Sequence, residues 1–88
     1  MTQYIEFEWD GHNENKIQQR HNVLPEEAEE CFFNRHKIRR YGSRYWLYGQ
    51  TDTGRYLFIV YIKKRADKVR VISARDMTDR ERQYFRRK

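Results

Sequence analysis

Hydrophobic and polar residues follow two strand-like patterns in the second half of the chain, and these patterns predict the centre of the fold. Residues 56–62, YLFIVYI, form an almost unbroken apolar and aromatic run, which predicts a central strand covered on both faces. Residues 69–74 alternate, which predicts a second strand with Val69, Val71 and Ser73 on one face and Arg70, Ile72 and Ala74 on the other. The charged segment 63–68, KKRADK, predicts the turn between them. We expect the other elements to pack on this hairpin.

The first third of the chain predicts one strand and two helices. Residues 4–9 alternate between polar and apolar side chains, as in a half-buried strand. Asp10 is suited to cap the N-terminus of a helix over 11–21, in which Ile17 is the one strong core residue. Pro25 opens a second helix, because proline suits the first helical turn. The apolar stripe of this second helix consists of Ala28, Cys31 and Phe32.

The rest of the chain predicts two further strands and a final helix. Residues 36–41, HKIRRY, predict a short edge strand protected by its charges, and residues 45–48 predict the next strand. The TDTG sequence at 51–54 predicts the turn that precedes the central strand. The T-x-x-E sequence at 78–81 is a capping box that begins the last helix. The apolar stripe of that helix is short and consists of Met77, Tyr84 and Phe85.

The predicted order, β-α-α-β-β-β-β-α, indicates an α+β fold with an antiparallel sheet and helices mainly on one face. We expect residues 1–88 to form a single domain of marginal stability, for which a protein partner or self-association is expected. No apolar run is long enough to span a membrane and no signal-peptide pattern is present, so we expect a cytoplasmic protein with no membrane partner. The single cysteine, Cys31, excludes an internal disulfide and is expected to be a small buried hydrophobe.

Charge is distributed unevenly along the chain. Through Phe33 there are eight acidic and two basic residues, a net charge of −6, and from Asn34 onward seventeen basic and five acidic residues give +12. This asymmetry indicates that the basic half meets a polyanion, with nucleic acid favoured. The acidic half can meet a basic partner, and a charge excess also serves simply to keep a small domain soluble.

The motifs of several common enzyme classes are absent. The chain has no G-x-x-x-x-G-K-[ST], G-x-G-x-x-G, H-E-x-x-H or G-x-S-x-G sequence, which argues against a nucleotide-dependent enzyme, a zincin and an α/β-hydrolase. Asp10 and His12 offer only two potential metal ligands, and the capping role of Asp10 is favoured. We therefore predict no metal site and no cofactor.

A surface rich in arginine, lysine and tyrosine is suited to RNA. Guanidinium groups bind phosphate, and aromatic rings stack on unpaired bases. The predicted RNA-binding residues are Lys16, Lys63, Lys64, Arg65, Tyr61 and Arg82. Cleavage of RNA without a metal needs positive charge at the pentacovalent phosphorane and an acceptor for the proton of the 2′-hydroxyl.

Three residues are candidates for such cleavage. Arg70 and Arg75 can supply charge but cannot accept a proton, and His21 is the acid–base candidate because histidine titrates near neutral pH. Each has a structural alternative. His21 is also a helix C-terminal residue favoured by the helix dipole, and Arg70 an exposed charge on a strand. For Arg75 the alternative is an ion pair with Asp79 or Glu81.

Several segments together resemble the BrnT family of toxins. They are F-E-W-D at 7–10, Arg20-His21, P-E-E-A at 25–28, Gly54-Arg55, R-V-I-S-A-R at 70–75, Met77-Thr78, and Glu81-Arg82 with Tyr84. The resemblance covers nearly the whole chain. It implies a RelE-like fold, cleavage of RNA without a metal, and neutralisation by a BrnA-type antitoxin, with a heterotetramer as one form of the complex. It also implies that DNA is bound only through the antitoxin complex.

On this resemblance we expect the toxin of a type II toxin–antitoxin system, an endoribonuclease that inhibits translation. Arg70 and Arg75 would bind phosphate, His21 would move protons, and Ser73 or Tyr84 would assist. The alternative is a non-catalytic module that binds nucleic acid or protein, a degenerate toxin that acts in the antitoxin complex and in repression.

Two positions depart from the resemblance, and one surface is expected to meet the antitoxin. Asn22 and Asn13 stand where many members of the family have glycine and lysine, and Lys16 would have to replace that lysine. Because covering the substrate surface silences a toxin most directly, we expect the antitoxin on the basic sheet face and the last helix. The alternative is docking on the acidic helices.

Overall fold

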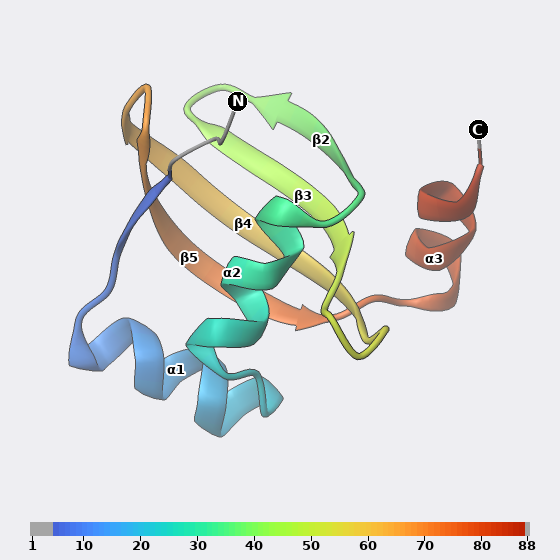
Figure 1. Ribbon diagram of the computed structural model, residues 1–88, viewed down its shortest axis with the longest axis horizontal. Helices are drawn as coiled ribbons and strands as arrows, with labels where there is room; N and C mark the ends of the chain where they lie inside the picture. The colour runs from blue at the N-terminus through green and yellow to red at the C-terminus, as the bar shows by residue number, and fades with distance from the viewer. Residues whose placement is uncertain (1–4, 88) are drawn as a thin grey trace.

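The computed structural model describes residues 5–87, which form one sheet with helices packed against it (Figure 1). In chain order the elements are β1 (Glu6–Glu8), α1 (Gly11–His21), α2 (Pro25–Phe33), β2 (His36–Tyr41), β3 (Arg44–Gln50), β4 (Tyr56–Arg65), β5 (Lys68–Asp76) and α3 (Asp79–Arg86). The predicted order of elements is confirmed. Tyr4, which the alternation assigned to the opening strand, lies outside the described residues.

The sheet is mixed, so the prediction of an antiparallel sheet is wrong at one edge. Its five strands lie in the order β1-β5-β4-β3-β2. The neighbours from β2 to β5 pair antiparallel, but β1 pairs with β5 in parallel, with Phe7 opposite Val69. The hairpin strands follow one another through short turns, which forces antiparallel pairing. β1 is separated from its neighbour by most of the chain and is free of that constraint.

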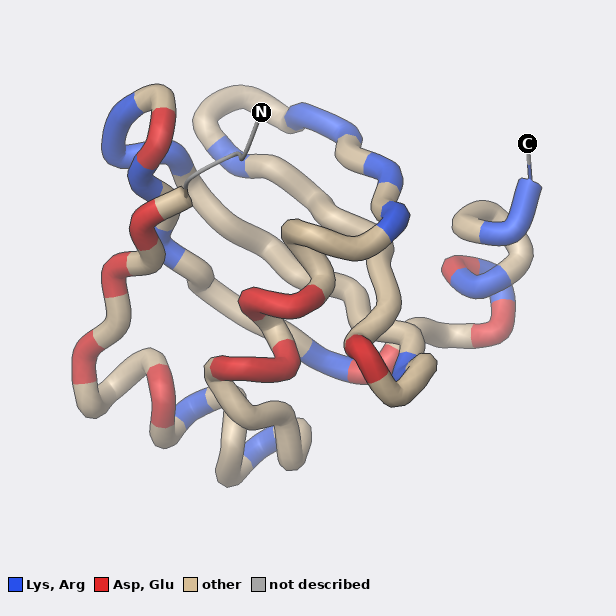
Figure 2. Tube along the Cα trace, viewed as in Figure 1, with Lys and Arg blue, Asp and Glu red and all other residues tan. Residues whose placement is uncertain are grey.

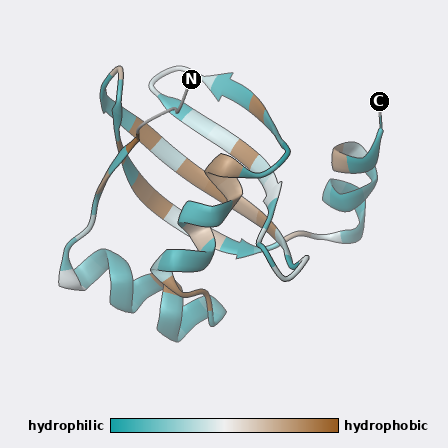
Figure 3. Ribbon diagram, in the orientation of Figure 1, coloured by the Kyte–Doolittle hydropathy of each residue, from teal (hydrophilic) through white to brown (hydrophobic). Residues whose placement is uncertain are grey.

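The helices divide between the two faces of the sheet. α1 and α2 cover one face, here called the α1/α2 face, and α3 packs near one end of the other, the α3 face (Figure 1). The main core lies under α1 and α2 and includes Ile17, Leu47 and Ile59. A smaller cluster on the α3 face contains Tyr48, Phe58, Met77 and Phe85. In Figure 3 apolar residues are concentrated on the sheet and on α2, whereas α1 and α3 are mostly hydrophilic.

A β-bulge in β5 changes the predicted faces of this strand. Tyr61 pairs with Val71 and Val60 pairs with Ser73, so Ile72 has no partner on β4. Because a bulge inserts one residue, side chains beyond it are shifted to the opposite face. Ala74 therefore joins the valines of β5 in the main core. Ser73 lies on the α3 face, so the predicted grouping of residues 69–74 is wrong after Val71.

The capping residues predicted at the N-termini of α1 and α3 are confirmed. Asp10 caps α1 by accepting a hydrogen bond from the Asn13 backbone, and Asn22 ends it in the left-handed conformation, at φ 54°. Thr78 and Glu81 form the reciprocal capping box of α3. The turn predicted over 63–68 is shorter than expected, because β4 continues to Arg65 and β5 begins at Lys68.

The guanidinium group of Arg55 joins three distant segments of the α1/α2 face. It donates to the carbonyl oxygens of His21 and Asn22, at 3.2 and 2.8 Å. It also forms ion pairs with Glu27 at the start of α2 and with Asp76 at the end of β5, at 3.2 and 2.7 Å. The C-terminal carbonyls of a helix have no partners within it, so Arg55 satisfies two of them from outside.

Helix α2 approaches the sheet closely because Gly49 has no side chain. A Cβ atom at this position would lie 3.0 Å from Cys31 Cβ and 3.0 Å from Leu47 Cδ2. Cys31 is completely buried, as predicted, and burial together with nearby carboxylates raises the pKa of its thiol to about 12. No helix within residues 5–87 combines the length and the apolarity needed to cross a membrane.

Replacement of Gly49 by alanine is expected to lower the free energy of unfolding by about 1–3 kcal/mol, because α2 must move off the sheet to admit the methyl group. Urea denaturation monitored by circular dichroism measures the change. Gly11→Ala is the matched control, since nothing lies within 4 Å of a Cβ added there. Equal stability of the two variants would contradict the close packing of α2.

Candidate functional site

The sheet separates the candidate catalytic residues that the sequence predicted. Arg70, Ser73 and Arg75 lie on β5 opposite Ile62, Val60 and Phe58 of β4, which alternate with the main-core residues of that strand. Ser73 and Arg75 follow the bulge, whereas Arg70 precedes it. His21 lies in the last turn of α1, on the other side. Tyr84 lies on α3, where its ring packs at 4.7 Å against that of Tyr48. The five residues therefore do not form one cluster.

Arg70 is held by carboxylates near the N-terminus of α1. Its guanidinium group forms ion pairs with Glu8 at 3.1 Å and Asp10 at 2.8 Å, and donates to Asn13 Oδ1 at 2.6 Å. The hydrogen bond from the Asn13 backbone, together with Arg70, holds the pKa of Asp10 below its usual range. Two carboxylates balance this one cation, so in this structure Arg70 ties β1 and α1 to β5.

Lys16 lies beside Arg70 where α1 meets β5. Its Nζ donates to the Ile72 carbonyl at 3.3 Å, while Asn13 donates to the neighbouring Val71 carbonyl at 2.7 Å. With His12, these residues line a shallow cavity of about 140 Å³. The α1–β5 contact thus uses carbonyl groups that the bulge leaves open to side chains.

Arg75 makes a two-pronged ion pair with Glu81, one of the two partners that the sequence left open. The oxygens of Glu81 lie 2.8 and 2.9 Å from the guanidinium nitrogens, and the Arg75 group lies 4.5 Å from the ring centroid of Phe58. Burial disfavours the charged form of Glu81, but hydrogen bonds from Arg75 and Thr78 lower its pKa overall. Arg75 therefore fixes an ionised carboxylate at the start of α3.

His21 belongs to the Arg55 network rather than to the arginines of the α3 face. Its carbonyl oxygen accepts from Arg55, and its side chain is only partly buried. Arg55, and to a smaller extent His21, hold the pKa of Asp76 below its usual range. Asp76 faces the helices, because it pairs across the sheet with the core residue Leu57. His21 therefore has the position of a C-terminal helix residue, the alternative noted above.

The predicted RNA-binding residues are dispersed. Tyr61 is 2% exposed and stacks on Tyr45 within the main core, so its ring offers no free face to a base and its prediction as a stacking residue is wrong. Burial raises its pKa to about 12. Lys63 lies 5.1 Å from the Tyr45 ring and Lys64 is exposed. The two predicted RNA-binding arginines form ion pairs with carboxylates. Arg65 pairs with Glu6 and Asp67, and Arg82 pairs with Asp79.

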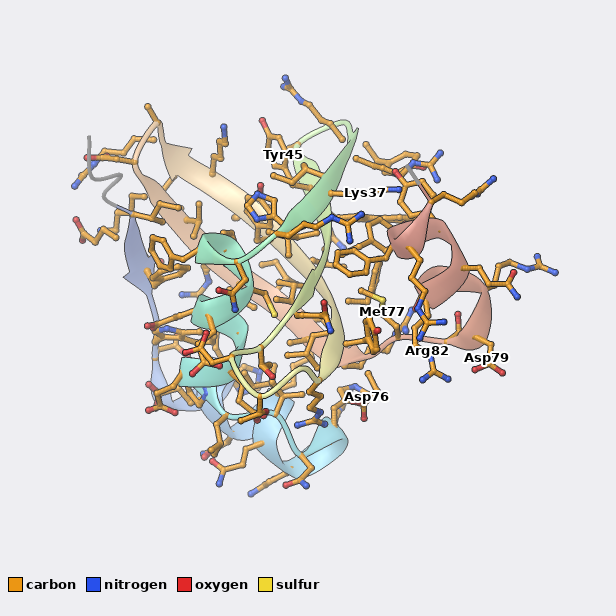
Figure 4. The ribbon with its side chains drawn as sticks, turned by 45° about the vertical axis from the view of Figure 1, so that its right-hand side comes forward. Lys37, Tyr45, Asp76, Met77, Asp79 and Arg82 are labelled. Carbon is orange, nitrogen blue, oxygen red and sulfur yellow. The ribbon has the colours of Figure 1, made fainter. Side chains whose placement is uncertain are left out.

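The densest group of cations surrounds Tyr84, between α3 and the strands β2 and β3. The cationic groups of Lys37, Arg39 and Arg87 lie 4.6, 5.4 and 5.9 Å from the centroid of the Tyr84 ring. Lys37 also donates to the carbonyls of Tyr84 and Arg87 at the end of α3, and Figure 4 shows its side chain directed toward that helix. Burial and the charges of nearby arginines lower the pKa of Lys37.

A cavity of about 440 Å³ opens in this region. We call it the Tyr84 cavity, and its lining consists of Arg39, Tyr48, Arg80, Glu81, Gln83, Tyr84 and Arg87. Among the described residues, none of its three arginines takes part in an ion pair. Its one carboxylate, Glu81, is already engaged by Arg75. The cavity therefore combines unbalanced positive charge with aromatic rings, which favours an anionic ligand with flat groups.

Most of this cavity was missed in the sequence. Its residues come from β2, β3 and α3, and only Tyr84 among them was a candidate. The charges of 36–41 were interpreted as protection of an edge strand. The feature of the sequence that pointed to this site was the clustering of positive charge in residues 36–41 and in the last helix. Figure 2 shows that these two segments are neighbours in the structure.

Comparison with protein families decides which class of protein this is. Residues 9–81 match the family described as the ribonuclease toxin BrnT of type II toxin–antitoxin systems. The chain belongs to the BrnT family. The resemblance inferred from the motifs is thereby confirmed. Membership of a family of ribonuclease toxins from toxin–antitoxin systems implies an antitoxin partner and an RNA target. The matched region includes Arg70, Arg75 and Glu81, whereas Tyr84 and Arg87 lie beyond its end.

A solved structure of this family shares the fold. The 1.1 Å crystal structure of the Brucella abortus ribonuclease toxin BrnT superposes with a TM-score of 0.68 at 16% sequence identity, over 89% of this chain and 100% of that chain. A comparison with curated protein sequences finds no match. The α+β fold of this BrnT-family chain thus persists where most residue identities have changed.

The Arg75–Glu81 pair predicts a pH-dependent contribution to stability. Because the folded-state pKa of Glu81 is lowered from 4.5, its contribution is present above that pH and is lost as the pH falls through the folded value. Glu81→Gln keeps the capping box and is expected to cost about 2 kcal/mol at pH 7. The difference from wild type should shrink as the pH falls below 4.5.

Urea denaturation between pH 3 and pH 7 tests this expectation. A difference in the free energy of unfolding between wild type and Glu81→Gln counts as significant when it exceeds about 0.5 kcal/mol. Asp79→Asn is the control, since this carboxylate is 89% exposed and its pair with Arg82 contributes little. A Glu81→Gln deficit that stays constant across this pH range would show that the charge of Glu81 is not the source.

Proposed function

We propose that this chain is a metal-independent endoribonuclease toxin whose substrate binds in the Tyr84 cavity. The observation that carries the proposal is the convergence, on a cavity lined by two tyrosine rings, of three arginines that have no ion-pair partner among residues 5–87. Guanidinium groups bind phosphate through two parallel hydrogen bonds, and tyrosine rings stack on unpaired bases. The three arginines are Arg39, Arg80 and Arg87.

The proposed reaction is attack by the 2′-hydroxyl of the substrate on the adjacent phosphate. The 2′-oxygen forms a bond to phosphorus while the bond to the 5′-oxygen breaks, which yields a 2′,3′-cyclic phosphate and a 5′-hydroxyl. The arginines stabilise the extra negative charge of the phosphorane. Glu81, ionised and lining the cavity, takes the proton of the 2′-hydroxyl. The hydroxyl of Tyr84 donates a proton to the departing 5′-oxygen, which becomes the 5′-hydroxyl, and the proton on Glu81 returns to Tyr84 through solvent.

The remaining candidates receive positioning roles in this proposal. Arg75 orients Glu81 through its two hydrogen bonds. Arg70 fixes the α1–β5 contact that supports the strand. Ser73 lies on the α3 face between them, and His21 acts through the Arg55 network at the end of the same strand.

RNA cleavage by this site would inhibit translation in the cytoplasm, and the antitoxin would be of the BrnA type. A heterotetramer of two toxins and two antitoxins, with DNA contacted only by the antitoxin, completes the proposal. The second candidate function is a non-catalytic member of the family that binds RNA or the antitoxin. It is favoured by the carboxylate partners of Arg70 and Arg75, which occupy the two arginines of the family-like segment.

Pure protein is expected to cleave single-stranded RNA in the presence of EDTA and to leave cyclic phosphate ends. Arg39→Ala and Arg87→Ala should each lower the cleavage rate about 10²–10³-fold, the usual effect of removing one donor to a developing oxyanion. Arg20→Ala is the matched control, an exposed arginine on α1 remote from the cavity. RNA binding without cleavage would favour the second candidate, and full activity in the Arg39/Arg87 double variant would refute this site.

Expression in bacteria tests the positioning arginines. Arg70→Ala or Arg75→Ala is expected to abolish growth inhibition, through a loss of about 2 kcal/mol of transition-state stabilisation. Removal of Arg75 frees the Glu81 carboxylate to turn, and removal of Arg70 leaves Glu8 and Asp10 without their shared cation. Arg20→Ala again serves as control. Full toxicity of the double variant at normal expression would exclude a role for both residues.

A further inference from the structure

Strand β2 is an open edge of the sheet. It pairs with β3 on one side, from His36 opposite Gly49 to Tyr41 opposite Arg44, and no strand within residues 5–87 lies along its other side. Along such an edge, alternate residues direct backbone N–H and C=O groups outward without ladder partners. These groups can bind one further strand by continuing the ladder.

The two sides of β2 differ in chemistry. Ile38 and Arg40 face the α1/α2 face, since their partners across the ladder are Leu47 and Tyr45 of the main core. Lys37 and Arg39 point to the α3 face and reach the Tyr84 ring. The alternation of a strand thus places two cations, Lys37 and Arg39, on one side, and Ile38, the one aliphatic residue of β2, beside Arg40 on the other.

The side of β2 that carries Ile38 continues into a cavity. A hollow of about 410 Å³ lies beside β2 on the α1/α2 face. It is lined by Ile5, Phe32, Ile38, Tyr61, Ala66 and Val69, together with His36 and Lys63. Ile38 is 46% exposed at its margin. Ile38 is therefore an exposed apolar side chain that lies both at a free strand edge and at the margin of this hollow, where another chain can bury it.

Charge excludes a second copy of the same strand as the occupant. Residues 31–51 contain no acidic residue, and β2 itself carries three cations, as Figure 2 shows along this edge. Pairing of two β2 strands would place like charges opposite each other, which destabilises a ladder. The same charges attract an acidic segment and accelerate its association.

We propose that β2 binds an extended acidic segment of the protein partner, which adds to the sheet as a sixth strand. Apolar residues at alternate positions of this segment enter the cavity beside Ile38, and acidic residues at the positions between them pair with Lys37 and Arg39. The segment thereby neutralises Lys37 and Arg39 beside the Tyr84 ring, and it competes with RNA for Arg39, which lines the Tyr84 cavity. Identification of the partner as the antitoxin rests on the proposed function, whereas the surface itself does not.

The probe for this surface is a fluorescent eight-residue peptide of alternating isoleucine and glutamate. It should bind the full chain, with affinity that falls at least tenfold between 50 and 500 mM salt, and it should slow hydrogen exchange at amides of β2. Two control peptides are used. In the first, the isoleucines form one block and the glutamates another; in the second, lysine replaces glutamate in the alternating sequence. Equal binding of either control, or binding with unchanged exchange in β2, would overturn the inference.

Variants of the protein locate the contact. Ile38→Glu should weaken binding of the alternating peptide at least tenfold and leave RNA cleavage unchanged, because Ile38 is outside the Tyr84 cavity. Ile38→Ser serves the same purpose should the charged variant fail to fold, and Arg20→Ala is the unaffected control. If the folded Ile38 variants bound the peptide with wild-type affinity, the proposed contact of the peptide with Ile38 and the hollow beside it would be refuted.

Hydrogen exchange with single-stranded RNA and the RNA cleavage assay distinguish this inference from the proposed function. Protection of β2 amides by single-stranded RNA, with no protection by the alternating peptide, would assign this edge to nucleic acid and overturn the inference. Absence of RNA cleavage with intact peptide binding would instead contradict the proposed function alone. Cleavage with no peptide binding would contradict the strand-addition surface alone.

Discussion

The guanidinium group of Arg55 is the interaction on which the arrangement of helices and sheet depends. It joins the end of α1, through the carbonyls of His21 and Asn22, to Glu27 at the start of α2 and Asp76 at the end of β5. One planar cation with five donors can satisfy all of these groups at once, which a lysine in the same place cannot. The connection between α1 and α2 is thereby fixed against the strand that carries Arg70 and Arg75.

The arginines of this chain fall into two groups with different consequences. Arg70 and Arg75 lie beside carboxylates that neutralise them, and their contribution is to hold elements in place. Arg39, Arg80 and Arg87 line a cavity in which the single carboxylate is already engaged. Uncompensated charge attracts a polyanion more strongly than paired charge does. Positive charge near α3, rather than the net charge of the whole chain, therefore bears on RNA binding.

The placement of β2 connects two surfaces that the sheet otherwise keeps apart. Because side chains alternate along a strand, Ile38 belongs to the margin of the main core while its neighbours Lys37 and Arg39 belong to the Tyr84 region. The strand that we propose adds along this edge would contact both surfaces. Binding at β2 would therefore change the surroundings of Tyr84 on the α3 face without any rearrangement of the core.

The secondary-structure elements, their order and the family could all be predicted from local patterns in the sequence. Capping residues such as Asp10 and the 78–81 box act within one helical turn, so local spacing is sufficient to identify them. The family segments are likewise short. By contrast, the ion pair between Arg70 and Glu8 joins residues 62 positions apart, and the parallel pairing of β1 leaves no trace in local spacing.

The tertiary structure alone decided which side chains share a surface. It placed His21 and Arg75 on opposite sides of the sheet, buried Tyr61, and assembled the cavity around Tyr84 from three separate elements. The unpaired Ile72 shows the physical reason. The side-chain period of a strand is two, so one inserted residue reverses every face assignment beyond it, and the position of the insertion is set by the neighbouring strand.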